Sequence, residues 1–241
     1  MANLSPSARP DNEAARLAAL RSFEVLAALA EPVFEEFVVL AARLFQVPIS
    51  LLSVVEETDV HYPATVGIPP HRRELRAEVL CSTAIALGQA VVYHDVLLEQ
   101  HPPIPEEVLR VAAENHVRFY AGALLRLPDQ HPLGTLCLVN HEPRPFTPDE
   151  QRILELLAGL VSQTLAVRHL CRARPATGEA QWKHLSTELH EEIGALNALV
   201  RYLNARNGSM VPVPTVFLAQ VEGRLHDLQG LLDAWSSGSK Q

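Results

Sequence analysis

Two apolar runs in the middle of the chain are joined by a short polar turn, and this pattern constrains the fold most. The runs are VRFYAGALLRL (117–127) and LGTLCLVNHEP (133–143), joined by the turn PDQHP (128–132). Short apolar runs on either side of a proline- and aspartate-containing turn predict a β-hairpin. The runs VPISLLSVVEE (47–57) and HYPATVGI (61–68) predict a second one. Because hairpins join antiparallel strands, we expect an antiparallel sheet.

Helical periodicity lies on both sides of these strands. In the long run that begins at Thr147, Pro148 suits the first turn and Glu150 stands at the capping-box position. A strand is predicted at 90–96, and the helices between strands are too short and too few for a doubly wound parallel sheet. The fold class is therefore α+β, a central antiparallel sheet with flanking helices. Helices are predicted at 11–26 (with Asp11 or Asn12 as N-cap), 32–45, 78–89, 105–115 and 147–170.

The last quarter of the chain has a different pattern. RARPATGEA (172–180) predicts a linker, and two periodic helices separated by a loop rich in Asn, Gly and Pro predict a helical hairpin over 181–236. Each helix has one apolar stripe that needs a partner. We therefore expect two hairpins from two chains to form a four-helix bundle, and the protein to be a homodimer. The predicted dimer seam is Leu185, Leu189, Ile193, Leu196, Val200, Leu218, Val221, Leu225, Leu228 and Leu232.

Composition narrows the function classes. A formal net charge of −8 gives no general attraction to nucleic acid, so no nucleic-acid partner is expected. Cys81, Cys137 and Cys171 are widely spaced and the histidines are scattered singly, so no metal site and no cofactor are predicted. The N-terminus lacks a signal-peptide layout, and no run of about 18 apolar residues occurs. We expect a cytoplasmic protein without a membrane partner.

Several ordered segments resemble a GAF domain of the bacterial sensory type. The most specific is RFYAGALL…LGTLCLVN…PRPFTPDEQ within 118–151. The resemblance implies a central antiparallel sheet with helices on one face and a ligand pocket on the other, in a sensory or dimerising module rather than a catalyst. We therefore divide the chain into a tail, a GAF domain, a linker, a helical hairpin and a second tail. Their ranges are 1–10, 11–171, 172–180, 181–236 and 237–241.

The sequence departs from its relatives where ligands are recognised. Related domains carry Trp-Phe after the first hairpin turn, where this chain has His61 and Tyr62. Bilin-binding GAF domains pair a cysteine with a following histidine, whereas Ser82 follows Cys81 here, so a covalent bilin is not expected. Cyclic-nucleotide GAF domains carry a signature that is absent. The resemblance therefore implies an unknown small-molecule ligand.

Five residues are the candidates for the ligand pocket, because the resemblance places their segments near it. Buried tyrosine, histidine and cysteine more often pack and satisfy hydrogen bonds than bind a ligand, so a structural role is weighed against each one. Cys137, inside the apolar run GTLCLV, is predicted to be a core residue. The pocket candidates are His61, Tyr62, Cys81, Tyr93 and Tyr120.

His190 raises a separate possibility. ELHEEIGALNALVRYL (188–203) resembles the dimerisation and phosphoacceptor helix of histidine kinases, whose motif reads Leu-His-Asp-x-x-Gly, with Glu191 in the aspartate position. His190 falls about 100° round the helix from Leu189, beside the seam rather than inside it. An adjacent carboxylate can hold one ring nitrogen. A degenerate dimerisation hairpin is the alternative, since no ATP-binding domain follows in this sequence.

These observations predict a signal-sensing or regulatory protein that is not an enzyme. Ligand binding would shift the helix that ends near His169, and a hinge at Pro175 and Gly178 would pass the change to the hairpin. One alternative is a phosphotransfer protein that uses His190 and a response regulator or histidine kinase as partner. A second alternative is a GAF-fold redox enzyme acting through Cys81.

Overall fold

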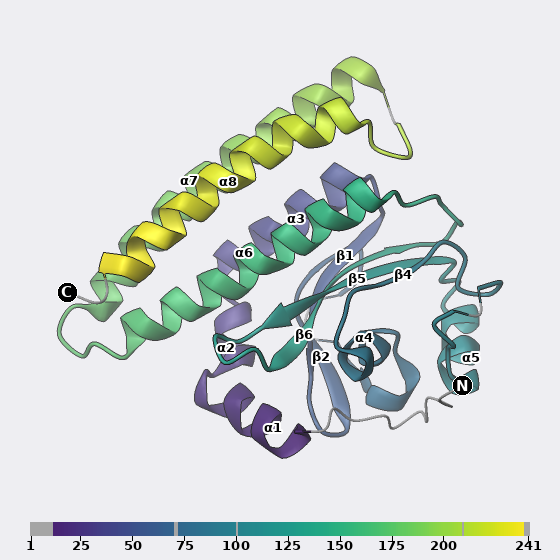
Figure 1. Ribbon diagram of the computed structural model, residues 1–241, viewed down its shortest axis with the longest axis horizontal. Helices are drawn as coiled ribbons and strands as arrows, with labels where there is room; N and C mark the ends of the chain where they lie inside the picture. The colour runs from purple at the N-terminus through teal and green to yellow at the C-terminus, as the bar shows by residue number, and fades with distance from the viewer. Residues whose placement is uncertain (1–11, 70–71, 100, 209, 239–241) are drawn as a thin grey trace.

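The computed structural model describes residues 12–69, 72–99, 101–208 and 210–238 (Figure 1). The predicted tail 1–10, the candidate N-cap Asp11 and most of the predicted tail 237–241 lie outside the described residues. The fold is α+β, as predicted, because helices flank an antiparallel sheet and two long helices follow it.

The sheet has six strands in the order β3-β2-β1-β6-β5-β4. The predicted central hairpin is confirmed, since β5 and β6 pair antiparallel from Phe119 opposite Asn140 onward. The second predicted hairpin is confirmed by the antiparallel pairing of β1 with β2. The strands are β1 (Ile49–Val55), β2 (Asp59–Val66), β3 (Arg73–Leu75), β4 (Val91–Tyr93), β5 (Phe119–Arg126) and β6 (Pro132–Asn140).

Two long helices, with two short helices beside them, cover one face of the sheet, and two other short helices cover the opposite face. The capping box predicted at the start of α6 is confirmed, because Thr147 Oγ1 accepts from Glu150 N at 3.1 Å and Glu150 Oε2 accepts from Thr147 N at 2.8 Å. The helices are α1 (Glu13–Ser22), α2 (Val25–Leu29), α3 (Pro32–Phe45), α4 (Cys81–Leu87), α5 (Glu106–Glu114), α6 (Pro148–Arg172), α7 (Gly178–Asn207) and α8 (Thr215–Gly238), with a 3₁₀ turn at Arg76–Glu78.

The two faces of the sheet bury separate clusters of side chains, because successive residues of a strand point to opposite faces. On β6, Leu136 and Leu138 belong to the cluster that includes α3 and α6, whereas Cys137 belongs to the cluster that includes α4 and α5. On β5, Phe119 and Tyr120 divide in the same way. The strands therefore connect the two halves of the core directly.

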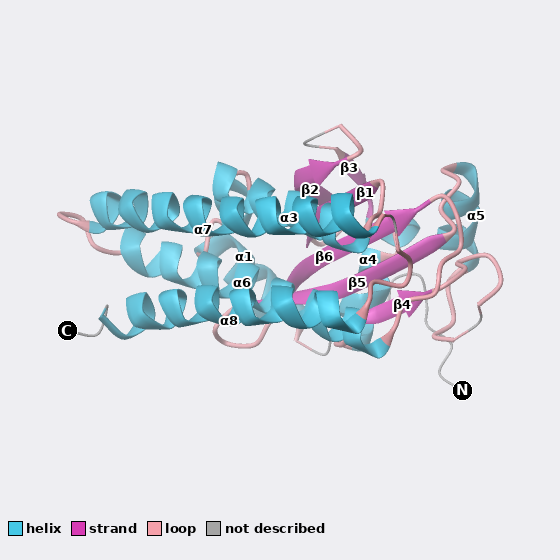
Figure 2. Ribbon diagram, turned by 90° about the horizontal axis from the view of Figure 1, so that it is seen from above, coloured by secondary structure: helices cyan, strands magenta, loops and turns pink. Residues whose placement is uncertain are grey.

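The α7–α8 hairpin lies along α3 and α6 of the same chain, so that four long helices run side by side (Figure 2). All ten residues of the predicted seam are buried, in the same cluster as Phe37 of α3 and Leu157 of α6. The expectation that this stripe needs a second chain is therefore wrong, because α3 and α6 cover it. The homodimer stays a prediction, and its interface would use other residues.

The connection between α6 and α7 is shorter than the predicted linker 172–180. Only 173–177 lie outside the two helices. A Cβ atom at Gly178 would lie 1.7 Å from the carbonyl oxygen of Cys171, so the turn needs glycine for a close backbone approach. This packing requirement explains Gly178 without a hinge.

Glu31, which directly precedes α3, fixes the end of the α7–α8 hairpin where α7 follows α6. Its Oε2 accepts from Trp182 Nε1 at 2.7 Å, and its Oε1 accepts from Arg168 Nε at 2.7 Å. Trp182 and Arg168 are both buried. One carboxylate thus joins α3, α6 and α7 through charge-assisted hydrogen bonds.

We expect Glu31→Ala to lower the free energy of unfolding by about 1–3 kcal/mol, because Trp182 and Arg168 would each keep a buried donor without its acceptor. Urea unfolding followed by circular dichroism measures the change. Glu35→Ala, an exposed position on the same helix, is the matched control and should have little effect. Equal values for the two variants would contradict the role given to Glu31.

Helix α6 is long and apolar enough to cross a membrane by length and composition alone. In the structure it packs against β5 on one side and α8 on the other, and more than half of its most apolar stretch is buried. Core helices of folded domains meet the same criteria. We therefore describe α6 as the central core helix.

Candidate functional site

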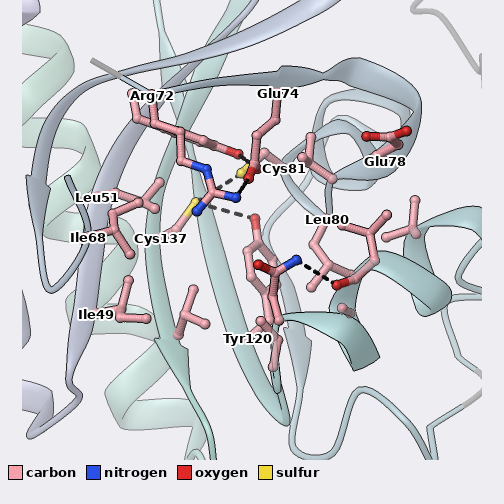
Figure 3. A pocket seen from close by; sticks show the side chains of 18 of the residues that line it. Ile49, Leu51, Ile68, Arg72, Glu74, Glu78, Leu80, Cys81, Tyr120 and Cys137 are labelled. Carbon is pink, nitrogen blue, oxygen red and sulfur yellow. Dashed lines mark hydrogen bonds and ion pairs between the residues drawn. The ribbon is translucent and has the colours of Figure 1, made fainter. Parts of the chain in front are cut away.

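A cavity of about 270 Å³ lies on the face of the sheet opposite α3 and α6. Strands β1, β2 and β6 form its floor, and α5 with the segments on either side of β3 forms its walls (Figure 3). Its walls are mostly apolar. A concave apolar site with a few polar groups is the usual form of a small-molecule site. The apolar lining includes Ile49, Leu51, Val79, Val108, Ala112 and Val139.

Charged and polar groups stand at one side of the cavity. Arg72 and Glu74 pair there, with Arg72 Nη2 2.7 Å from Glu74 Oε1. Tyr62 donates its hydroxyl to Glu74 Oε2 at 2.7 Å. Burial, together with the nearby carboxylate, raises the pKa of Tyr62 well above its ordinary value. Tyr62 is therefore a neutral donor, and Glu74 is held between it and Arg72.

Two thiols meet at the inner wall of the cavity (Figure 3). Cys81 comes from α4 and Cys137 from β6, and their Sγ atoms are 3.4 Å apart. Thr135 Oγ1 lies 2.8 Å and the Tyr120 hydroxyl 3.4 Å from Cys137 Sγ. The hydrogen bond from Cys137 lowers the pKa of Cys81 to about 7, whereas burial raises the pKa of Cys137. Of the two thiols, Cys81 is therefore the one that ionises more readily.

Three of the five pocket candidates, Tyr62, Cys81 and Tyr120, line this cavity. His61 does not, because it alternates with Tyr62 along β2, and its Nε2 lies 3.1 Å from a carboxylate oxygen of Glu56 instead. Tyr93 does not either, because β4 is the edge strand and its ring packs 6.4 Å from that of Tyr120. The placement of His61 and Tyr93 in the pocket is corrected. Ligand contact by the other three stays a prediction.

Sequence reasoning did not place Cys137, Arg72 or Glu74 at the cavity. Cys137 was expected in the core, which its burial confirms, and strand alternation on β6 also places it on the cavity face. Arg72 and Glu74 lie in the basic run HRRELR (71–76), which gave no sign of a pocket edge. Counting alternate residues along β6 from Val139 would have found Cys137, once the hairpin register was known.

The profile of the GAF domain family matches residues 30–165, more than half of the chain. The chain belongs to the GAF domain family. The matched range contains the whole sheet and every residue that lines the cavity. The family resemblance in the sequence is thus confirmed, and the helical region predicted after the GAF domain is present as α7 and α8. GAF domains are sensory and regulatory modules.

One curated relative of this GAF protein is a cyclic di-GMP phosphodiesterase of Pseudomonas aeruginosa. It is 31% identical over 186 residues, which are 76% of this chain and 30% of the relative. The chain thus spans less than a third of that protein. Because a relative named as an enzyme matches, the expectation that this chain is not an enzyme is overturned.

Two solved structures are among those similar to this chain. The blue-light absorbing form of the PixJ GAF domain from Thermosynechococcus elongatus matches with a TM-score of 0.49 and 19% identity, over 65% of this chain and 92% of that one. A type II free methionine-R-sulfoxide reductase from Thermoplasma acidophilum matches with a TM-score of 0.41 and 18% identity, over 49% of this chain and 79% of that one.

The thiols of the GAF domain should alkylate with different pH profiles, because the thiolate is the nucleophile. With a pKa of about 7, Cys81 should react with iodoacetamide roughly tenfold faster per pH unit up to that value and no faster above it. Burial raises the pKa of Cys171, so its rate should still be rising at alkaline pH. Peptide mass spectrometry after timed quenching measures both rates. Identical profiles would contradict this assignment.

His190 lies on α7, where the GAF domain meets the hairpin. Its side chain is 63% exposed, and its Nδ1 lies 3.4 Å from Glu36 Oε1 of α3. It stands beside the buried Leu189, as the helical period predicted. The carboxylate that faces the ring is therefore Glu36, and not the neighbouring Glu191 that the motif suggested.

Within 12–69, 72–99, 101–208 and 210–238, no three or more His, Cys, Asp or Glu side chains gather where they could hold a metal ion.

Proposed function

We propose that the GAF domain senses a small molecule in the cavity and passes the binding event through the sheet to the α7–α8 hairpin. The cavity itself is the observation that supports this most, since about 270 Å³ of space with apolar walls and a charged side lies against the buried cluster on this face of the sheet. Protein interiors are normally close-packed, with few voids larger than a water molecule.

The lining indicates the class of ligand. Apolar side chains such as Leu51 and Val108 would bury an apolar body. At the charged side, Arg72 can donate hydrogen bonds to an acceptor of the ligand, and Glu74 and Glu78 can accept them from a donor of the ligand. We therefore propose a small amphiphile that carries both a hydrogen-bond donor and an acceptor at one end.

The strands give a route from the cavity to the hairpin. Cys137 and Val139 line the cavity. Leu136 and Leu138, which alternate with them along β6, pack in the cluster that contains α3 and α6. The hairpin packs directly on those two helices. A ligand that shifts β6 would therefore shift the support of α7 and α8. This contiguous packing is the proposed physical route of the coupling.

The Pseudomonas aeruginosa relative supports a place in signalling. Its name assigns it to cyclic di-GMP turnover, and it aligns over 76% of this chain. We propose that the aligned region serves as a regulatory input in both proteins. The proposal includes a cytoplasmic location and a homodimer whose interface lies outside the buried stripe of α7 and α8.

A fragment screen tests ligand binding. Ligand-observed NMR with small amphiphilic fragments identifies binders, and hydrogen exchange of the full chain then locates them. Bound fragments should slow exchange in β1, α4 and α5, which line or flank the cavity. Slowed exchange only in other segments, or a screen without any binder, would overturn the proposal.

Phosphotransfer at His190 is a second candidate, favoured by the exposed ring and by the Glu36 carboxylate 3.4 Å from its Nδ1. Incubation with a phosphorylated receiver domain should give an acid-labile label that His190→Gln abolishes. His184→Gln is the matched control, since His184 is equally exposed on the same helix and also faces a carboxylate, that of Glu188. Wild-type protein without acid-labile label would remove this candidate.

A further inference from the structure

Two of the three cysteines lie together at the cavity wall, where ligand binding as proposed above does not need them. Cys81 and Cys137 come from different elements, α4 and β6, yet their sulfur atoms are 3.4 Å apart. Their side chains are only 4% and 1% exposed to bulk solvent, but both line the cavity. A small oxidant that enters the cavity therefore reaches both. The third cysteine, Cys171, is buried in α6, on the other side of the sheet.

The surroundings favour one thiolate beside one thiol. Thr135 Oγ1 and the Tyr120 hydroxyl lie at 2.8 Å and 3.4 Å from Cys137 Sγ, and Ser53 Oγ lies 2.7 Å from Thr135 Oγ1. The Thr135 and Tyr120 hydroxyl groups are therefore placed to hydrogen-bond the sulfur of Cys137. The pKa of Cys81, lowered to about 7 by its hydrogen bond with Cys137, also favours ionisation of this thiol. A reactive thiolate with a second thiol next to it is the arrangement in which a sulfenic acid condenses to a disulfide.

We propose that Cys81 and Cys137 form a reversible disulfide when a hydroperoxide enters the cavity. The Cys81 thiolate attacks one peroxide oxygen, the O–O bond breaks, and the other oxygen leaves and takes a proton to become an alcohol or water. The Cys137 sulfur then attacks the sulfur of the Cys81 sulfenic acid. The S–S bond forms, and the hydroxyl group leaves as water with the Cys137 proton. The thiol pair loses two electrons, and the peroxide gains them.

Closing the bond requires a small movement. An S–S bond is about 2.05 Å long, so the sulfur atoms must approach by about 1.4 Å. Cys137 lies on a strand paired on both sides, whereas Cys81 lies on the short helix α4. We therefore expect α4 to move toward the sheet and narrow the cavity. The disulfide and this narrowing stand without the proposed ligand binding; only the effect of the narrowing on a bound ligand rests on it.

Mass spectrometry of the full-length wild-type chain tests the disulfide. Reduced protein is treated with hydrogen peroxide, quenched, denatured and alkylated, so that the fully reduced chain takes up three alkyl groups. We expect Cys81 and Cys137 to be lost together as one cross-linked peptide pair, at least about tenfold faster than Cys171, and to be restored by dithiothreitol. Oxidation of Cys171 at the same rate, or no cross-linked pair, would overturn the proposal.

Variants assign the two roles. Cys137→Ser should stop at a Cys81 sulfenic acid that dimedone traps, Cys81→Ser should give neither product, and Cys171→Ser should behave as wild type. If dimedone labelled Cys137 in Cys81→Ser as fast as the cysteine pair of the wild type is oxidised, the proposed order of attack would be contradicted. The wild-type experiment stands even where a variant fails to fold. A fragment that binds the oxidised and reduced proteins equally would overturn the narrowing of the cavity and leave the disulfide in place.

Discussion

Replacing Glu150 with alanine should lower the free energy of unfolding by about 3–5 kcal/mol, because it leaves a buried charge without its partner. Glu150 is fully buried, and its Oε1 accepts from Arg144 Nη2 at 2.6 Å. The Arg144 side chain is only 3% exposed and also donates to the carbonyl oxygen of Phe45. Without the carboxylate, the guanidinium stays in the core uncompensated.

Glu150 also satisfies two backbone groups. Its Oε2 accepts from Thr147 N in the capping box of α6, and its Oε1 accepts from Val213 N at 3.1 Å in the connection between α7 and α8. The same side chain therefore fixes the start of the core helix and the far end of the hairpin. Alanine removes both contacts together with the ion pair.

Urea unfolding monitored by circular dichroism measures this loss. Glu155→Ala is the matched control, since Glu155 is exposed on the same helix and bonds only to Gln151 among its described hydrogen-bond partners. We expect the control to change stability by no more than about 0.5 kcal/mol. A Glu150→Ala protein as stable as the control would mean that Arg144 and Glu150 are not buried as a pair.

The second large effect concerns the hairpin stripe. Leu189→Ala should lower the free energy of unfolding by about 2–5 kcal/mol, the usual cost of a cavity left by a buried leucine. Leu189 is fully buried in the cluster that also contains Val33 and Phe37 of α3. Because this burial is complete within one chain, the loss should be the same at every protein concentration.

Unfolding measured at protein concentrations two orders of magnitude apart shows whether the stripe is buried within one chain or in a subunit interface. Stability that depends on a subunit interface rises with protein concentration. Glu191→Ala, an exposed change two residues further along the same helix, controls for helix propensity. If the loss of unfolding free energy in Leu189→Ala became smaller as the protein concentration rose, the stripe would have to lie in a dimer interface.

Local patterns predicted much of the GAF domain, because local chemistry determines them. The turn PDQHP and its flanking runs were enough for the β5–β6 hairpin, and Thr147 with Glu150 was enough for the capping box. The burial of the hairpin against its own chain was not predicted. An apolar stripe looks the same whichever helix covers it. The signal available was α3, which is apolar on more than one face, from Phe34 to Leu44, and a helix apolar all round is buried on all sides.

The cavity shows the same limit of sequence-based prediction, here for single residues. His61 and Tyr62 are neighbours on β2, and one of them necessarily faces away from the cavity. The choice depends on strand register, and a one-residue slip exchanges the two faces. The pairing of β1 with β2 includes an irregularity between Leu52 and Val54, which no sequence period reveals. The meeting of Cys81 with Cys137 likewise depends on where α4 sits over the sheet.

Ligand binding in the cavity is the central claim, and two adjacent alanines of α5 test it most directly. Ala112 is buried and lines the cavity, whereas Ala113 is exposed on the outer face. Phenylalanine at 112 would fill the cavity, and phenylalanine at 113 would point into solvent. The measurement is the Kd of the tightest-binding fragment for wild type, Ala112→Phe and Ala113→Phe. We predict binding weakened at least about tenfold, or about 1.4 kcal/mol, in Ala112→Phe alone; equal Kd values for all three folded proteins would contradict the account.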